Sequence, residues 1–149
     1  MPQTYTKLTY HFTFGTRGRV NALYENLRPR LYSYLARIIN DDFGFSREIG
    51  GMENHVHILC DLSPTVDISS FMRRLKAGSS GWLHREVPRL DTISWQEGYG
   101  AFSVSASAVP SVREYIRKQE RHHRGLSFKE EFRRLLDKHG IEFEEKYLF

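Results

Sequence analysis

HVHILCDL, residues 55–62, is the most informative segment of the chain. Its apolar and β-branched residues predict a strand, and successive side chains of a strand point to opposite faces. One face then carries Val56, Ile58, Cys60 and Leu62 and is expected to pack inward. The other carries His55 and His57 and is left for chemistry. Two imidazoles at positions i and i+2 can point toward one metal ion, although an isolated pair is weak evidence for a site.

Strand and helix patterns alternate on both sides of this stretch. The predicted elements, in order, are a strand at 4–14, a helix from 29 to 40–41, strands at 43–52 and 55–62, a helix at 66–87, a strand at 95–105, a helix from 110 and a helix at 127–140. A turn at 53–54 joins the two central strands as an antiparallel hairpin. This order predicts an α+β fold, a ferredoxin-like split β-α-β antiparallel sheet with additional C-terminal helices.

Length and composition agree with one domain that covers residues 1–149. The chain is 40% hydrophobic and 27% charged, and its net charge of +4 favours polyanionic partners. The positive charge is concentrated between Arg113 and Arg124. Cys60 is the single cysteine and cannot form an internal disulfide, which favours a reducing compartment. Without a signal-peptide pattern or a long apolar run, the sequence predicts a cytoplasmic protein that has no membrane partner.

A second group of candidate residues lies in VREYIRKQ, residues 112–119. The pattern predicts a helix, on which Tyr115 and Gln119 at i and i+4 share one face and can meet the same site. His11 on the first strand can face the same sheet surface. The adjacent His122 and His123 are open to three interpretations, as metal ligands, as phosphate contacts or as a polar helix end, of which we favour the last.

Basic and aromatic residues suggest how a nucleic acid would be held. The cations expected to neutralise phosphates are Arg17, Arg19, Arg73, Arg74, Lys76, Arg117 and Arg121. Trp95, Tyr99 or Phe102 could stack on bases. The competing interpretation is a solvated surface for the cations and a hydrophobic core for the aromatic residues, and we favour the core for the latter.

Taken together, the segments YHFTFGTRGRV, GGMENHVHILCDL, LKAGSSGWL, WQEGYGAFSVSAS and VREYIRKQERHH resemble the IS200/IS605-type single-tyrosine transposases of the HUH superfamily, including relatives associated with repetitive extragenic palindromes (REP). The resemblance covers nearly the whole chain, and HVHIL followed by YIRKQ is its most specific part. The usual motif often has proline and aspartate before the first histidine, where this chain has Glu53 and Asn54. We do not interpret that difference as a loss of activity, although it could alter the groups that support the first histidine.

The resemblance implies a function and a site. His55, His57 and Gln119 would bind the metal, Mg²⁺ or Mn²⁺, and Tyr115 would become joined to a 5′ phosphate. The substrate would be single-stranded DNA with hairpin ends, with the LKAGSS segment near the hairpin. The implied assembly is a homodimer with composite active sites, in which the tyrosine helix of one subunit completes the histidine site of the other.

Two alternatives remain open from the sequence. One is a domesticated REP-associated nuclease with the same chemistry that acts on chromosomal palindromes. The other is a ferredoxin-like nucleic-acid-binding module without catalysis. The sequence also names no base that would deprotonate the tyrosine, whose unperturbed pKa of about 10 leaves little phenolate at neutral pH.

Overall fold

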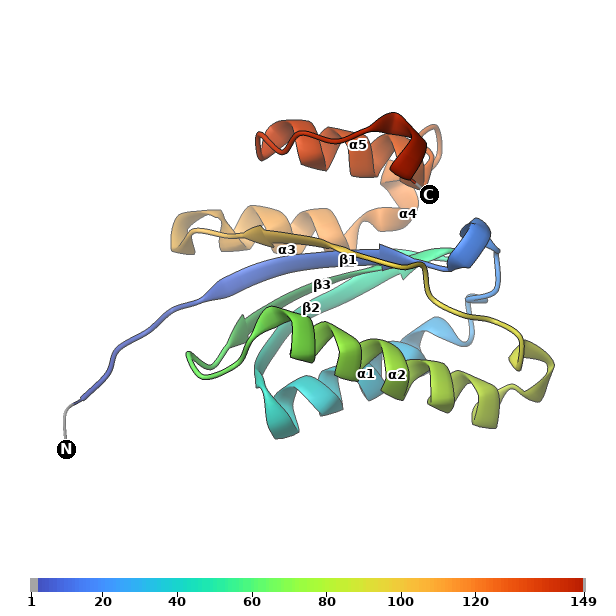
Figure 1. Ribbon diagram of the computed structural model, residues 1–149, viewed down its shortest axis with the longest axis horizontal. Helices are drawn as coiled ribbons and strands as arrows, with labels where there is room; N and C mark the ends of the chain where they lie inside the picture. Colours follow the sequence, from blue (N-terminus) through green and yellow to red (C-terminus); the bar gives the residue numbers. More distant parts are fainter. Residues whose placement is uncertain (1–2, 149) are drawn as a thin grey trace.

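A four-stranded antiparallel sheet organises the chain, with helices on both of its faces (Figure 1). The computed structural model describes residues 3–148, apart from the side chain of His122. The strands are β1 (Thr9–Gly15), β2 (Gly44–Met52), β3 (His55–Leu62) and β4 (Gly100–Ser103), in the order β2-β3-β1-β4. The helices are α1 (Arg28–Asp42), α2 (Ile68–Glu86), α3 (Val109–Arg117), α4 (Gln119–His122) and α5 (Phe128–Lys138). Short 3₁₀ turns lie at Arg17–Arg19, Pro88–Leu90, Ala106–Ala108 and Glu145–Tyr147.

The strand order confirms the predicted ferredoxin-like arrangement. β3 lies between β1 and β2 and is antiparallel to both, and β1 also pairs with β4. The predicted hairpin at 53–54 joins β2 to β3, where Met52 pairs with His55. β3 is therefore an inner strand, held on both sides, and the positions of its histidines are fixed by two ladders of hydrogen bonds.

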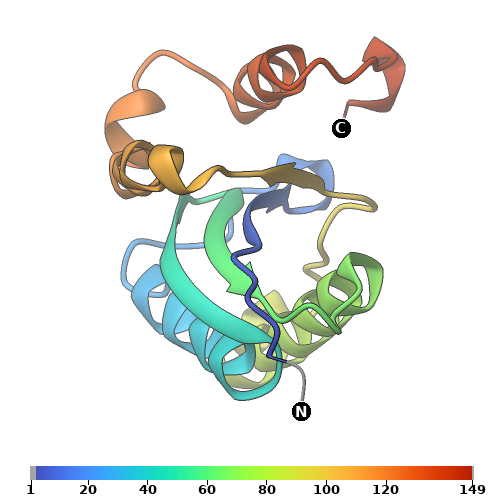
Figure 2. The same ribbon diagram turned by 90° about the vertical axis from the view of Figure 1, so that its left-hand side faces the viewer.

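The two faces of the sheet are covered by different helices (Figure 2). α1 and α2 cover one face, where Phe12, Phe14, Val56 and Ile58 are fully buried in the main core. α3 lies on the other face, and Leu59 packs there with Val109 and Ile116. α5 lies farther out on that side, with Phe128 and Phe132 in a third cluster. The histidine face is therefore not open to solvent but enclosed between the sheet and the C-terminal helices.

Several boundaries differ from the sequence prediction. β1 begins at Thr9 and not at residue 4. Residues 3–8 are exposed and have no regular secondary structure. β4 spans only Gly100–Ser103, and Trp95 forms an isolated bridge with Thr16. α2 continues through Gly78 and Gly81 to Glu86. Gly78 has a packing role in this helix, since an added Cβ would lie 3.1 Å from Ile38 and 3.3 Å from Tyr34 of α1. Among residues 3–148, no helix has both the length and the apolar character needed to span a bilayer.

Candidate metal and tyrosine site

The two histidines of β3 lie fully buried on the enclosed face of the sheet. They are on the strand face opposite Val56 and Ile58, as the alternation predicted. Gln119, at the start of α4, is also buried, and its Oε1 lies 3.0 Å from Nε2 of His55. The structure thus brings together the three residues that the family resemblance implied as metal ligands.

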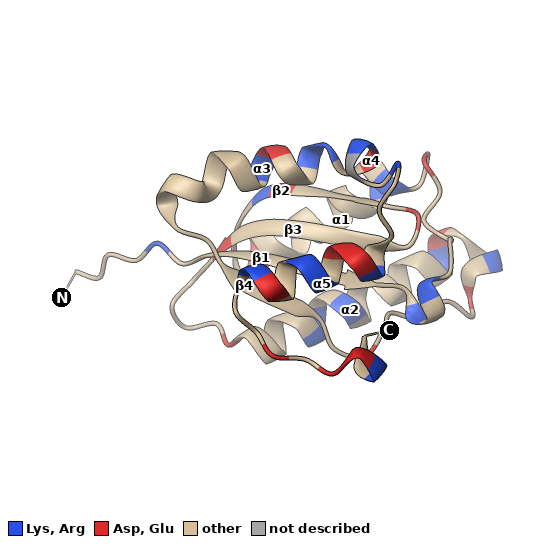
Figure 3. Cartoon of the chain, turned by 90° about the horizontal axis from the view of Figure 1, so that it is seen from above, with Lys and Arg blue, Asp and Glu red and all other residues tan. Residues whose placement is uncertain are grey.

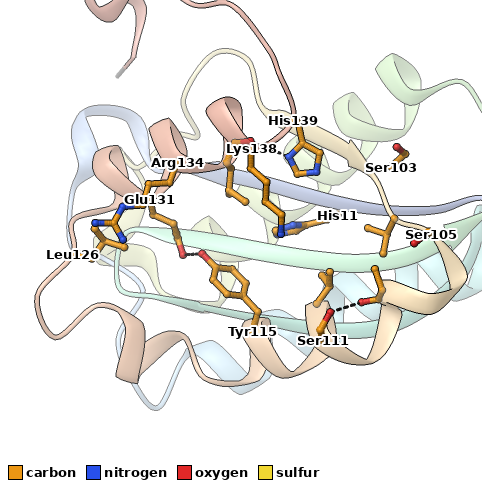
Figure 4. A pocket seen from close by; sticks show the side chains of 14 residues that line it. His11, Ser103, Ser105, Ser111, Tyr115, Leu126, Glu131, Arg134, Lys138 and His139 are labelled. Carbon is orange, nitrogen blue, oxygen red and sulfur yellow. Dashed lines mark hydrogen bonds between the residues drawn. The ribbon is translucent and has the colours of Figure 1, made fainter.

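Glu131 of α5 is the residue at the centre of the site, and the sequence analysis missed it. Its side chain is buried, and its Oε1 lies 2.9 Å from Nε2 of His57 and 3.3 Å from Nε2 of His55. Its Oε2 accepts hydrogen bonds from the Tyr115 hydroxyl (Figure 4) and from Nε2 of Gln119. One carboxylate therefore joins the histidine pair, the amide and the phenol.

The ring orientation of each β3 histidine is set by a neighbour on its other nitrogen. Nδ1 of His55 lies 2.8 Å from Oδ1 of Asn54, which can only accept, so Nδ1 carries the hydrogen and Nε2 presents a lone pair. Nδ1 of His57 lies 2.8 Å from Nε2 of His11. A hydrogen on Nδ1 of His57 would leave its Nε2 as a second lone pair facing the site. Such outer partners commonly orient metal-binding imidazoles.

The site places acceptor atoms against one another. Gln119 donates through Nε2 to Glu131, so its Oε1 is the atom that faces the lone pair of His55. Oε1 of Glu131 faces the same lone pair at 3.3 Å. Three acceptors at such short separations repel one another unless a cation lies between them. These lone-pair-bearing nitrogen and oxygen atoms are therefore suited to bind a metal ion. The ligand atoms of His55, His57 and Glu131 lie within 4.8 Å of one another.

The separations also match the size of a small divalent ion. Ligands at about 2.1 Å from an octahedral ion are about 3.0 Å apart when they are adjacent. The distances from Oε1 of Glu131 to Nε2 of His57 and to Nε2 of His55 are 2.9 and 3.3 Å. The distance from Oε1 of Gln119 to Nε2 of His55 is 3.0 Å. Little movement is needed for these atoms to share one ion.

Burial and the local charges shift the acid–base behaviour of these groups. Burial lowers the pKa of His55 to about 4 against the opposing effect of Glu131, so its ring is neutral near pH 7. Burial also lowers the pKa of His11, with His57 acting in the same direction. Burial and the charge of Glu131 raise the pKa of Tyr115, which keeps the phenol protonated. Burial alone would raise the pKa of Glu131, but the nearby imidazoles, His57 first, hold it well below its usual value.

His123 lies at the same site, contrary to the favoured interpretation as a polar helix end. Its Nε2 lies 3.1 Å from Oε1 of Glu131, and its Nδ1 donates to the carbonyl oxygen of Leu126. Burial lowers its pKa, but the carboxylate of Glu131 outweighs that effect and raises it overall. His123 is thus placed to compensate the charge of Glu131. The side chain of His122 lies outside the described residues.

The helix that carries the tyrosine is interrupted, which the sequence did not predict. α3 ends at Arg117, Lys118 has non-helical angles (φ −101°, ψ 27°), and α4 begins at Gln119. Tyr115 and Gln119 nevertheless both reach Glu131. α3 approaches β2 at Gly50, where an added Cβ would lie 2.5 Å from the carbonyl oxygen of Ile116. The lack of a side chain at Gly50 therefore sets how close the tyrosine helix lies to the sheet.

The predicted phosphate-binding cations lie in different parts of the chain. Arg117 and Arg121 belong to the basic end of α3 and to α4 (Figure 3), and Arg117 pairs with Glu48 at 3.0 Å. On α2, Arg73 is exposed and Arg74 pairs with Asp42 at 2.6 Å.

The remaining cations lie at or near the loop after β1. Arg17 pairs with Glu97 at 3.8 Å, and Arg19 is exposed with a positive φ of 57°. Nζ of Lys76 donates to the carbonyl oxygens of Gln96 and Gly98, so it holds the segment before β4. The aromatic residues follow the core interpretation at Trp95 and Phe102, which are buried, and Tyr99 is partly buried.

Comparisons with known proteins agree with these findings. Residues 4–119 match the family model described as "Transposase IS200 like". The transposases for insertion sequence element IS200 of Salmonella typhimurium LT2 and of Salmonella typhi are each 27% identical over 115 residues, which is 74% of this chain and 75% of theirs.

Two solved structures share the fold. A candidate transposase from Deinococcus radiodurans R1 has a TM-score of 0.65 at 24% identity, over 80% of this chain and 96% of that one. A REP-associated tyrosine transposase bound to a REP hairpin has a TM-score of 0.61 at 20% identity, over 83% and 73% of the two chains.

Proposed function

The chain belongs to the IS200-like transposase family, and from this premise we propose that it cuts and rejoins one strand of DNA through Tyr115. The observation that supports this most strongly is the hydrogen bond from the Tyr115 hydroxyl to Glu131, whose other oxygen lies beside both β3 histidines. It links the expected nucleophile to the expected metal ligands. We further propose that residues 1–149 act as one domain, because α5, beyond the segment that matches the family model, supplies Glu131.

The proposed metal ligands are His55 and His57 with Oε1 of Gln119 and Oε1 of Glu131. Mg²⁺ or Mn²⁺ suits a set with two oxygens, and the imidazoles favour Mn²⁺ of the two. When bound, the ion would withdraw negative charge from the phosphate oxygens as the bond breaks. Asn54 and His11 would orient the two imidazoles, so the departure from the usual proline and aspartate is compatible with support of the first histidine.

Tyr115 would act as the nucleophile in a reaction that exchanges one phosphate ester bond for another. Its phenolic oxygen forms a bond to phosphorus while the bond from phosphorus to the 3′ oxygen of the upstream nucleotide breaks. The phenolic proton passes to solvent water, and the departing 3′ oxygen takes up one proton from water and becomes a 3′ hydroxyl. Glu131 accepts the hydroxyl hydrogen bond and so orients the phenol before attack. A free 3′ hydroxyl can reverse the step and join a different strand, because the phosphotyrosine keeps the energy of the broken bond.

The proposed substrate is single-stranded DNA with hairpin ends, since one structural neighbour of the same fold is described as bound to a REP hairpin. A domesticated nuclease with the same chemistry would use the same groups on chromosomal palindromes. Copies of the gene flanked by hairpin ends would favour the mobile element. The observed approach of Tyr115 to the buried histidines favours either of these over a module that only binds.

The assembly that we propose is a homodimer with composite sites. In the described chain Tyr115 bonds to Glu131 of the same chain, so one chain alone also contains all the groups. Mixing Tyr115→Phe with His57→Ala distinguishes these arrangements. Composite sites restore cleavage in the mixed dimer because one of its two sites is intact, whereas sites within single chains leave the mixture inactive.

The test of function is the formation of a covalent protein–DNA product. The protein is incubated with hairpin-containing single-stranded oligonucleotides and Mn²⁺ and resolved on a denaturing gel. We expect a protein-linked product that Tyr115→Phe and His57→Ala both abolish and that Tyr147→Phe, an exposed tyrosine 72% accessible, leaves intact. A product that forms equally in all variants would contradict the assigned roles.

A further inference from the structure

A cavity of about 660 Å³ lies between α3, α5 and the end of β4, and Tyr115 and Glu131 are among its lining residues. Figure 4 shows the residues around it, which come from segments far apart in the sequence. His55, His57 and Gln119 are not among its lining residues. The cavity therefore meets the site at Tyr115 and Glu131 and does not reach His55, His57 or Gln119.

The walls of this cavity combine apolar and polar groups. Val104, Val112 and Leu135 supply apolar surface, and the serine hydroxyls near the end of β4 supply hydrogen-bonding groups. The ring of His139 lies in the wall and stacks on Phe102, with centroids 4.4 Å apart and an angle of 21°. Sites for small organic ligands have volumes of about 300–1,000 Å³ and this kind of mixed lining. A single nucleotide is a ligand of that size.

Two cations of α5 line the cavity without a compensating carboxylate. Arg134 and Lys138 are exposed, and neither forms an ion pair with any carboxylate among residues 3–148. In contrast, Arg133 on the same helix pairs with Glu145. Figure 4 shows Lys138 extending from the end of α5 toward His11. Uncompensated cations beside a mixed cavity provide a site for a phosphate group attached to a ring system.

We propose that this cavity binds the nucleotide on the 3′ side of the scissile phosphate, which is the nucleotide that stays joined to Tyr115 through its 5′ phosphate. The proposal rests on the function proposed above. That nucleotide must remain within one sugar of the tyrosine oxygen after cleavage, and Tyr115 lines the cavity. The upstream nucleotide leaves with the 3′ oxygen, whose developing charge belongs on the side of His55 and His57. The direction of the cavity thus selects the downstream nucleotide.

A mononucleotide tests this proposal without any hairpin, metal or cleavage. Binding of thymidine 5′-monophosphate is followed by ¹H–¹⁵N NMR, with thymidine 3′-monophosphate and inorganic phosphate as comparisons. We expect the 5′-monophosphate to shift the amides of Val112, Tyr115 and Leu135 and to bind about tenfold more tightly than either comparison. Equal binding of the 3′-monophosphate, or shifts confined to other parts of the chain, would overturn the proposal.

Two matched pairs of variants locate the binding. Ser105 lines the cavity and Ser107 does not, although both are exposed and their hydroxyls lie 3.3 Å apart. We expect Ser105→Trp to weaken binding of the 5′-monophosphate about tenfold or more and Ser107→Trp to leave it unchanged. Lys138→Gln is expected to weaken it about tenfold, because a charged hydrogen bond to phosphate is lost, whereas Lys129→Gln on the same helix should not.

The variants also separate this proposal from the proposed function. Equal affinity in Ser105→Trp and Ser107→Trp, both with parent-like melting temperatures, would exclude the cavity as the binding site. So would equal affinity in Lys138→Gln and Lys129→Gln, which change only the surface charge. Neither result affects the covalent product expected at Tyr115. If the unmutated protein binds the mononucleotide but forms no covalent product with DNA, the proposed function would be contradicted and the binding site would not.

Discussion

Replacing Glu131 with glutamine removes the only negative charge among the described side chains that meet at the β3 histidines. The amide keeps the size and one acceptor oxygen of the carboxylate, which lies 2.9 Å from Nε2 of His57 and 3.3 Å from Nε2 of His55. The remaining proposed ligands, two imidazoles and Gln119, bring no negative charge. We therefore expect Glu131→Gln to fold and to bind Mn²⁺ about a hundredfold more weakly than the parent, because an anionic ligand has become neutral.

The loss can be measured as a change in stability, because an ion that binds only the folded protein stabilises it by mass action. A hundredfold loss of affinity at the same excess of Mn²⁺ removes about 2.7 kcal/mol of that stabilisation. For a domain of this size the Mn²⁺-induced rise in melting temperature should shrink by about 5–10 °C. Differential scanning fluorimetry with and without Mn²⁺ measures it, with Asp137→Asn, an exposed carboxylate of α5, as the control. An equal Mn²⁺-induced rise in melting temperature in the parent, Glu131→Gln and Asp137→Asn would show that the Glu131 carboxylate does not contribute to ion binding.

Two further predictions concern the fold that positions the site. Arg47 donates two hydrogen bonds to Asp61, at 2.8 and 2.6 Å, and these lower the pKa of the Asp61 carboxyl. The ionised carboxylate therefore stabilises the folded protein at pH values above its unfolded pKa of about 3.9. This stabilisation is lost as the pH falls through the lower pKa of the folded state. Asp61→Asn should cost about 1 kcal/mol at pH 7 and flatten the fall in stability below about pH 4 in urea titrations; an unchanged pH profile would contradict this role. Gly50→Ala should force α3 away from β2, cost about 1–3 kcal/mol and reduce covalent product at Tyr115, because its Cβ would meet the Ile116 carbonyl. Gly125→Ala, with nothing within 4 Å of the added Cβ, is the control, and equal product from both variants would be the contrary result.

The sheet and its order could be predicted from the sequence because strand periodicity is local. The alternation of 55–62 places His55 and His57 on one face, and the short turn at 53–54 leaves an antiparallel hairpin as the simple connection. The ends of elements were harder to predict. Residues 4–8 share the alternation of β1, but Tyr5 and Leu8 are exposed. The paired strand begins at Thr9, beyond a single hydrogen bond from the Leu62 amide to the Leu8 carbonyl oxygen.

Glu131 was missed because its role depends on distant segments. Seventy-four positions separate it from His57 in the sequence, and nothing in that spacing indicates a contact. One signal was present. Glu131 lies on the apolar stripe of α5, between Phe128 and Leu135, where a charged residue is out of place on a helix face that packs inward. A carboxylate at such a position predicts a buried partner, even where the partner cannot be named.

The cations show the opposite difficulty, since charge is visible in the sequence but its partners are not. Lys76 looks like a phosphate-binding residue, yet its ammonium donates to two backbone carbonyls before β4. Nothing in the sequence distinguished Arg134 and Lys138 from other charged residues of the last helix, although they line the cavity beside Tyr115. The arrangement of the helices in space decides which positive charges are already compensated.

Attack of Tyr115 on DNA beside an ion held by His55, His57, Gln119 and Glu131 would leave a nucleotide bonded to the Tyr115 peptide only when the ion is present. Tandem mass spectrometry of the protein, after reaction with a hairpin oligonucleotide and digestion with protease and nuclease, detects that nucleotide. We expect a nucleotide attached to the Tyr115 peptide in Mn²⁺ and no adduct after chelation. An adduct on another residue, or one on Tyr115 that forms equally well in excess chelator, would contradict this mechanism.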